Sequence, residues 1–184
     1  MRKTILSLMF PVVLYLTSSG EAQNVYKIAG LTARDQYISA YSGFQTKMTE
    51  LGYKEGLNVA YDFHNAKGDQ QALIYLADKI VQNKPTLIVT TSTSDTIPVA
   101  KATKESQIPV VFLSAGNPLA LVKSYQSSGN HLTGIGTPAI ELATKRMEIL
   151  KELVPGIKRV FSLVNPGGSN YEDYRQITNE AQAG

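Results

Sequence analysis

The sequence predicts an α/β fold built on a doubly wound parallel sheet. After Gln23, short β-branched apolar runs alternate with segments whose apolar residues recur every three or four positions. The connections are short, so successive strands are expected to run parallel and to be joined by right-handed helical crossovers. The run Leu87-Ile88-Val89 has no polar alternation, which indicates a strand covered on both faces.

The first half of the chain gives two strand–helix pairs. Strands are expected at residues 25–31 and 57–63. The first helix is defined by apolar residues at steps of four and three and stops at Gly52; its core residues are Tyr37, Tyr41, Phe44, Met48 and Leu51. The second helix covers residues 73–81, and Asp69 is its expected N-cap.

The second half continues the alternation. Strands are expected at residues 86–91, 109–113, 132–136 and 158–164. A helix over 95–106 carries Pro98 in its first turn, where proline is tolerated. A longer helix over 143–154 ends at Pro155-Gly156, and a last helix starts near Tyr171.

Residues 1–22 have the pattern of a secretory signal peptide. Arg2 and Lys3 precede an apolar run over 5–16, and small residues lead to a cleavage position after Ala22. A membrane anchor is the alternative, but the run is short and Pro11 interrupts it. The expected location is a bacterial periplasm, where disulfides are allowed but not required.

Composition excludes several classes of function. The chain has 184 residues and no cysteine, which excludes disulfides, thiolate metal sites and a cysteine nucleophile. Lys plus Arg number 18 against 15 Asp plus Glu, and this net charge of +3 is too small to indicate nucleic-acid binding. Neither a metal nor a cofactor is expected.

Ligands of open parallel sheets bind beyond the carboxyl ends of the strands. The loops expected there carry hydroxyls, amides and glycines; the candidates are Thr32, Ser92, Thr93, Ser94, Ser114, Asn117 and Asn165. Hydroxyls beside helix N-terminal amides suit a carboxylate or phosphate. Simple N-capping by Ser94 is the alternative for the 91–94 loop, although capping needs only one such residue.

An enzyme is not expected. Arg34 and Asp35 are the titratable groups near the predicted strand ends, and neither His64 nor His131 has a carboxylate placed by sequence to orient it. A dinucleotide site at 134–136 is disfavoured because the third glycine of that motif is absent.

Several segments resemble the substrate-binding proteins of ABC importers, in particular the family with tryptophan- and tyrosine-type binding proteins. The similar segments are Phe44 to Asn58, Ala66-Lys67-Gly68-Asp69, Ile108 to Phe112, Gly116-Asn117-Pro118, Gly129 to Gly134, Lys145 to Lys151, Val154-Pro155-Gly156 and Val164-Asn165-Pro166. One departure is Asn117, where the family usually has Asp; a neutral amide would hold a ligand amino group less well.

The resemblance implies a type I periplasmic-binding-protein fold, a two-lobed clamshell with its ligand in the cleft. Residues 23–136 would form the complete N-terminal lobe and 137–184 the start of a truncated second lobe, with a hinge near 136–138. Asn165 and Tyr171 would approach the ligand from the second lobe. The chain is expected to be a fragment of a longer protein.

The implied function is to bind a small solute without changing it chemically. The solute is expected to be an amino acid, with aromatic amino acids among the candidates. The implied partner is an ABC permease with its ATPase, which would be the sole link to the membrane. An extracytoplasmic ligand-sensing module of a signalling system is the alternative, since the same fold serves both roles.

Overall fold

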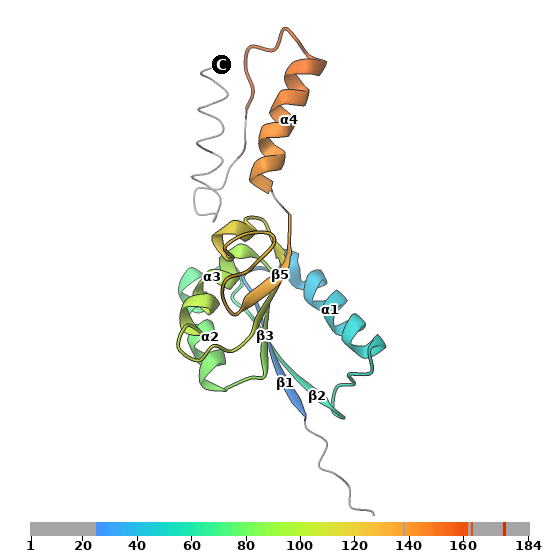
Figure 1. Ribbon diagram of the computed structural model, residues 1–184, viewed down its shortest axis with the longest axis vertical. Coiled ribbons are helices and arrows are strands. Elements are labelled where there is room, and N and C mark those ends of the chain that lie inside the picture. Colours follow the sequence, from blue (N-terminus) through green and yellow to red (C-terminus); the bar gives the residue numbers. More distant parts are fainter. Residues whose placement is uncertain (1–24, 138, 162, 164–174, 176–184) are drawn as a thin grey trace, which may run out of the picture.

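The structure is a computed structural model that describes residues 25–137, 139–161, 163 and 175. Strands and helices alternate along it (Figure 1). The strands are β1 (Tyr26–Thr32), β2 (Val59–Asn65), β3 (Leu87–Thr90), β4 (Val110–Ala115) and β5 (Leu132–Gly136). The helices are α1 (Ile38–Glu50), α2 (Gln70–Gln82), α3 (Thr93–Ala102) and α4 (Ala139–Leu153), with short 3-10 turns η1 (Asp35–Tyr37) and η2 (Pro118–Ala120).

The five strands form one parallel sheet in the order β2-β1-β3-β4-β5. The first strand lies inside the sheet, where it pairs with β2 along its whole length and with β3 from Ile28 to Leu31. The predicted parallel α/β fold is therefore confirmed, and the carboxyl ends of all five strands lie at one edge.

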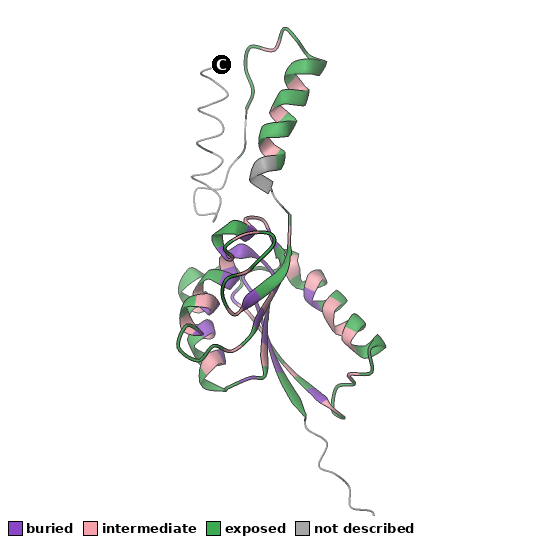
Figure 2. Ribbon diagram, viewed as in Figure 1, coloured by how far each residue is buried: buried purple, intermediate pink, exposed green. Residues whose placement is uncertain are grey.

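Helices α2 and α3 cover one face of the sheet, and α1 covers the other (Figure 1). The larger core lies under α2 and α3 (Figure 2). It contains the buried residues Ala29, Leu31, Ala33, Ala66, Leu73, Ala77, Ile80, Ile88, Val99, Val110, Phe112, Ala115, Leu121 and Leu132. Alternate residues of each strand point to opposite faces, which is why Ile88 joins this core and Val89 does not.

The α1 face has a smaller core of Ile28, Tyr41, Val59 and Val89. The ring of Tyr41 lies against Gly30, where a Cβ would overlap it. Glycine at this position of β1 lets α1 approach the sheet closely.

Local signals in the sequence explain where the helices begin and end. The Asp69 carboxylate accepts hydrogen bonds from the amides of Gln71 and Ala72, which confirms Asp69 as the N-cap of α2. Gly52, just beyond α1, has a φ of +92°, a conformation that glycine adopts without strain.

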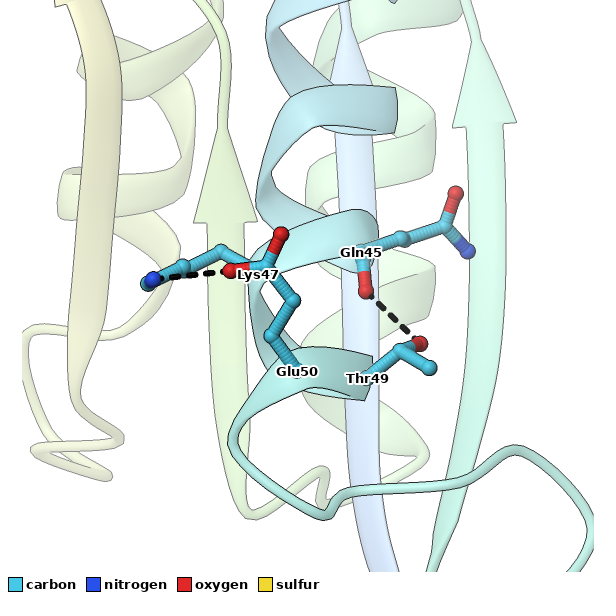
Figure 3. Close-up of polar contacts among 4 residues, drawn as sticks. All are labelled: Gln45, Lys47, Thr49 and Glu50. Carbon is cyan, nitrogen blue, oxygen red and sulfur yellow. Dashed lines mark hydrogen bonds and ion pairs between the residues drawn. The ribbon is translucent and has the colours of Figure 1, made fainter.

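The last turn of α1 has an exposed polar surface (Figure 3). Lys47 Nζ lies 2.8 Å from Glu50 Oε2, and Thr49 Oγ1 donates to the Gln45 carbonyl at 3.0 Å. Exposed pairs of this kind add little stability, so α1 is held mainly by its apolar side.

The strand predicted at 158–164 is wrong for the residues described there, because 158–161 and 163 are not in a strand. Phe161 is 92% exposed and Leu163 fully exposed, so no described element covers them. An apolar strand needs a neighbouring strand and a cover, and the described residues supply neither. The predicted signal peptide and the helix from Tyr171 lie outside the described residues.

Candidate functional site

The loops after β1, β3 and β4 meet at the carboxyl edge of the sheet. Hydrogen bonds join them directly. The Ala33 amide, after β1, donates to Asp95 Oδ2 at 3.2 Å, and the Asn117 amide, after β4, donates to Thr93 Oγ1 at 3.1 Å. Because Thr93 and Asp95 both belong to the first turn of α3, this helix start is the centre of the candidate site.

The structure brings six of the eight predicted residues to this edge. Thr32 (0% exposed), Thr93 (3%) and Ser92 (4%) are buried. Ser94 and Asn117 are half-buried, and Ser114 is exposed. The other two, Asn165 and Tyr171, lie outside the described residues.

The buried hydroxyls are engaged inside the protein. Thr32 Oγ1 lies 2.7 Å from Thr91 Oγ1 and within hydrogen-bond distance of the Arg34 carbonyl. Ser92 Oγ donates to Asp95 Oδ1 at 2.7 Å. Ser94 Oγ lies 3.1 Å from Ser92 Oγ. Ser94 is half-buried, whereas Thr91, Ser92 and Thr93 are buried, so Ser94 is the most accessible of the four hydroxyls at residues 91–94.

The N-cap of α3 is Ser92, two residues before the predicted Ser94. Ser92 and Asp95 form a capping box, and the Ser92 amide donates to Asp95 Oδ1 at 2.6 Å. The helix consequently starts at Thr93 rather than at 95. The early amides of a helix have no intrahelical acceptors, so α3 directs amide groups at this edge.

Asp95 is the functional candidate that sequence inspection missed. It is 0% exposed, and it accepts hydrogen bonds from the amide and the hydroxyl of Thr91 as well as from Ser92 and Ala33. Burial raises the pKa of this carboxyl, and its hydrogen bonds to Thr91 and Ser92 oppose that rise. The Ser-x-x-Asp spacing from 92 to 95 was the signal that could have identified it.

Each of the two histidines has a neighbour that the sequence did not predict, and His64, in register with Leu31 near the carboxyl end of β2, is the nearer of the two to this edge. His64, inside β2, has Nε2 at 3.0 Å from Asp62 Oδ1, although the two groups are not aligned for a hydrogen bond. His131 Nε2 lies 2.7 Å from Thr103 Oγ1, beyond the far end of α3. Within the described residues, no group of three acidic or histidine side chains is placed to hold a metal ion. No helix there has the length and apolar character needed to cross a membrane.

This fold and edge define a class: a parallel α/β unit in which a helix N-terminus and several hydroxyls gather at the carboxyl edge of the sheet. Comparison with protein families makes the assignment specific. The family of ABC transporter substrate-binding proteins matches residues 27–182, and the chain belongs to it. Members of this family are solute-binding proteins, not enzymes.

Individual relatives agree with this assignment. A tyrosine-binding protein of Clostridioides difficile (strain R20291) is 30% identical over 156 residues, covering 84% of this chain and 44% of the relative. The crystal structure of a conserved domain protein of Vibrio cholerae O1 matches with a TM-score of 0.73 and 25% identity, covering 87% of this chain and 54% of that one.

A third relative was solved in complex with L-Trp. This ABC domain from Streptococcus pneumoniae matches with a TM-score of 0.69 and 28% identity, over 87% of this chain and 53% of that one. The chain thus spans about half the length of the relatives it matches.

Proposed function

We propose that this chain supplies the N-terminal lobe, residues 23–136, of an extracytoplasmic substrate-binding protein of an ABC importer. The proposed ligand is an amino acid, and aromatic amino acids are the first candidates. Family membership supports the binding role, and the tyrosine-binding and L-Trp-bound relatives support the ligand class. In this proposal residues 137–184 begin a second lobe, and the ligand is held between the two lobes.

One observation carries the proposal: the first turn of α3 lies at the carboxyl edge of the sheet beside Ser94 and Asn117. A ligand carboxylate would receive hydrogen bonds from the α3 amides and from Ser94, as anions do at helix N-termini. Ser114, near the end of β4, and Asn117, in the loop after β4, would contact the other polar atoms of the ligand. Thr32, Ser92 and Thr93 would hold these loops in place through their hydrogen bonds, and Asn165 and Tyr171 would contact the ligand from the second lobe.

The remaining parts of the proposal concern location and partners. Residues 1–22 would direct export and be removed before Gln23, so the mature protein would work in the periplasm. There it would pass its solute to an ABC permease driven by its ATPase. The pattern of residues 1–22 and the family assignment support this location.

A titration followed by ¹H–¹⁵N NMR tests the binding proposal, because it detects millimolar affinities. L-Tryptophan and L-tyrosine are each added to the 184-residue chain, with arabinose as a comparison sugar. The amides of Thr93, Ser94 and Gly116 are expected to shift with the amino acids and not with the sugar. Shifts scattered over the surface, or none with either amino acid, would contradict the proposal.

The variant Ser94→Ala makes the test specific. Loss of one ligand hydrogen bond is expected to weaken binding by about 1 kcal/mol, roughly fivefold. Ser106→Ala is the matched control, since Ser106 lies beyond the opposite end of α3 and is exposed. It should leave the affinity unchanged.

A further inference from the structure

The carboxylate of Asp95 connects loops that are far apart in the sequence. Ala33, whose amide reaches Asp95 Oδ2, precedes it by 62 residues. The Thr91 amide reaches the same oxygen at 3.2 Å, and the Thr91 hydroxyl reaches it at 2.7 Å. The other oxygen, Oδ1, receives the amide and the hydroxyl of Ser92. One side chain therefore fixes the loop after β1 to the loop after β3.

Asp69 shows that helix capping alone does not need this arrangement. It is exposed, and among the described residues its carboxylate accepts hydrogen bonds only from the amides of Gln71 and Ala72 in its own helix. Asp95 caps α3 in a similar way but is fully buried and also bonds an amide of another loop. Burying a carboxylate is costly unless it is fully hydrogen-bonded, so its position needs a reason beyond the cap.

The donors around Asp95 also decide where the hydroxyl protons point. Three of the five groups that donate hydrogen bonds to Asp95 are backbone amides, which are donors only. The ionised Asp95 carboxylate is an acceptor only, so each of the two hydroxyls beside it must donate its proton. The single protons of the Thr91 and Ser92 hydroxyls are directed inward to Asp95.

The hydrogen bonds from Thr91 and Ser92 to Asp95 also constrain two neighbouring hydroxyls. Because Thr91 gives its proton to Asp95, Thr91 can only accept in its 2.7 Å contact with Thr32, and the Thr32 proton is shared between Thr91 and the Arg34 carbonyl at 3.0 Å. Ser92 likewise can only accept in its 3.1 Å contact with Ser94, and a ligand carboxylate would take over the Ser94 proton. Thr91 and Ser92 therefore both give their protons to Asp95 and act only as acceptors toward their neighbours.

We infer that Asp95 is a positioning residue of the candidate site. It holds the loop after β1 against the first turn of α3, and it orients the hydroxyls of Thr91 and Ser92 away from a ligand. The α3 amides and Ser94 remain as the groups of this loop that meet the ligand. The effect on a ligand rests on the proposed function, whereas the effect on the loops does not.

Asp95→Asn removes the carboxylate while keeping its shape. An amide group has one accepting oxygen, and its nitrogen only donates. If the asparagine nitrogen takes the position of Oδ1, this nitrogen faces the Ser92 amide. If it takes the position of Oδ2, it faces the amides of Ala33 and Thr91. In either orientation at least one backbone amide loses its acceptor.

Amide hydrogen exchange of the 184-residue chain tests the inference without a ligand. The Ile88 amide, which donates to the Pro109 carbonyl in the core, reports global opening. Relative to Ile88, at least one of the Ala33 and Ser92 amides of Asp95→Asn is expected to exchange about tenfold faster or more, depending on which way the new amide group is turned. The matched variant Asp69→Asn should leave Ala33 unchanged. Unchanged protection of both Ala33 and Ser92 in Asp95→Asn, or an equal loss in Asp69→Asn, would overturn the inference.

L-Tryptophan binding, followed by the Ser94 and Gly116 amide shifts, is the second arm. Asp95→Asn is expected to weaken binding about tenfold or more, and Asp69→Asn is expected to bind like the wild-type chain. Equal affinity of wild-type and Asp95→Asn chains would refute the positioning role. If the wild-type chain binds neither L-tryptophan nor L-tyrosine, the proposed function fails, while the exchange arm still decides the role of Asp95.

A second pair of variants applies if Asp95→Asn does not fold. Thr91→Val removes the hydroxyl that links Thr32 to Asp95, and Thr91→Ser keeps it. Ala33 exchange is expected to be several-fold faster in Thr91→Val and restored in Thr91→Ser. The same exchange rate in both variants would contradict a role for the Thr91 hydroxyl in linking the loop after β1 to Asp95.

Discussion

The two faces of the sheet differ in how completely they are covered. On the α2 and α3 side, Leu31 and Ile88 are fully buried in one large core. On the α1 side, the buried core has four residues, Leu113 is half-buried, and Ile135 of β5 is 72% exposed. Uniformly apolar strands indicate two covered faces, yet within the described residues only one face has two helices packed on it (Figure 2).

The largest effect is expected from a cavity on the well-covered face. Leu31→Ala should lower the free energy of unfolding by about 3 kcal/mol, because a fully buried leucine loses its packing contacts and leaves a void. Leu113→Ala, on the other face, should cost about 1 kcal/mol because water already reaches that side chain. Urea unfolding of both variants measures the difference. Equal losses would show that the two faces are packed equally well.

A smaller effect of opposite sign is expected at the centre of the α1 face. The hydroxyls of Tyr41 and Tyr61 are buried without hydrogen-bond partners among the described residues. Tyr41→Phe removes one such group and should raise the free energy of unfolding by about 1 kcal/mol. A loss of stability on urea unfolding would mean that this hydroxyl has a partner in solution.

The same tyrosine links stability to pH. Burial raises the pKa of Tyr41 above its ordinary value of 10.0, so the folded protein holds this proton more tightly than the unfolded chain does. Titration of Tyr41 therefore leaves the free energy of unfolding unchanged below pH 10 and lowers it as the pH rises beyond that value. In Tyr41→Phe the decline of stability between pH 9.5 and 11 should be shallower than in the wild-type chain.

The smallest effect on stability is expected at the exposed edge strand. Ile135→Ser should change the free energy of unfolding by no more than about 0.5 kcal/mol, because the side chain is already mostly in water. Urea unfolding of the variant and the wild-type chain measures this difference. A marked loss of stability would place Ile135 in a contact that the described residues do not show.

Much of the fold was predictable because its signals are local. Strand–helix alternation defined the parallel sheet, and Asp69 marked the start of α2 before any contact was known. The strand predicted at 158–164 failed for the opposite reason. Its β-branched and apolar residues suit a strand, but Phe161 and Leu163 have no neighbouring strand among the described residues.

The candidate site was predictable in its location but not in its internal bonding. The rule that ligands bind at the carboxyl ends of parallel strands indicated the loops that the structure brings together. It could not show that the hydroxyls of Thr32 and Ser92 are turned inward, because that depends on a carboxylate that meets Ala33 across 62 residues. The roles of the site residues toward a ligand remain predictions.

The strand order also constrains how the chain can fold during synthesis. Among the described residues the earliest strand in the sequence, β1, is an interior one, and its two neighbours end at Asn65 and Thr90. A nascent chain emerging from the ribosome therefore carries β1 with an unpaired edge until β3 has been made. Such non-local pairing slows folding, so a chain of this topology stays unfolded for longer after synthesis.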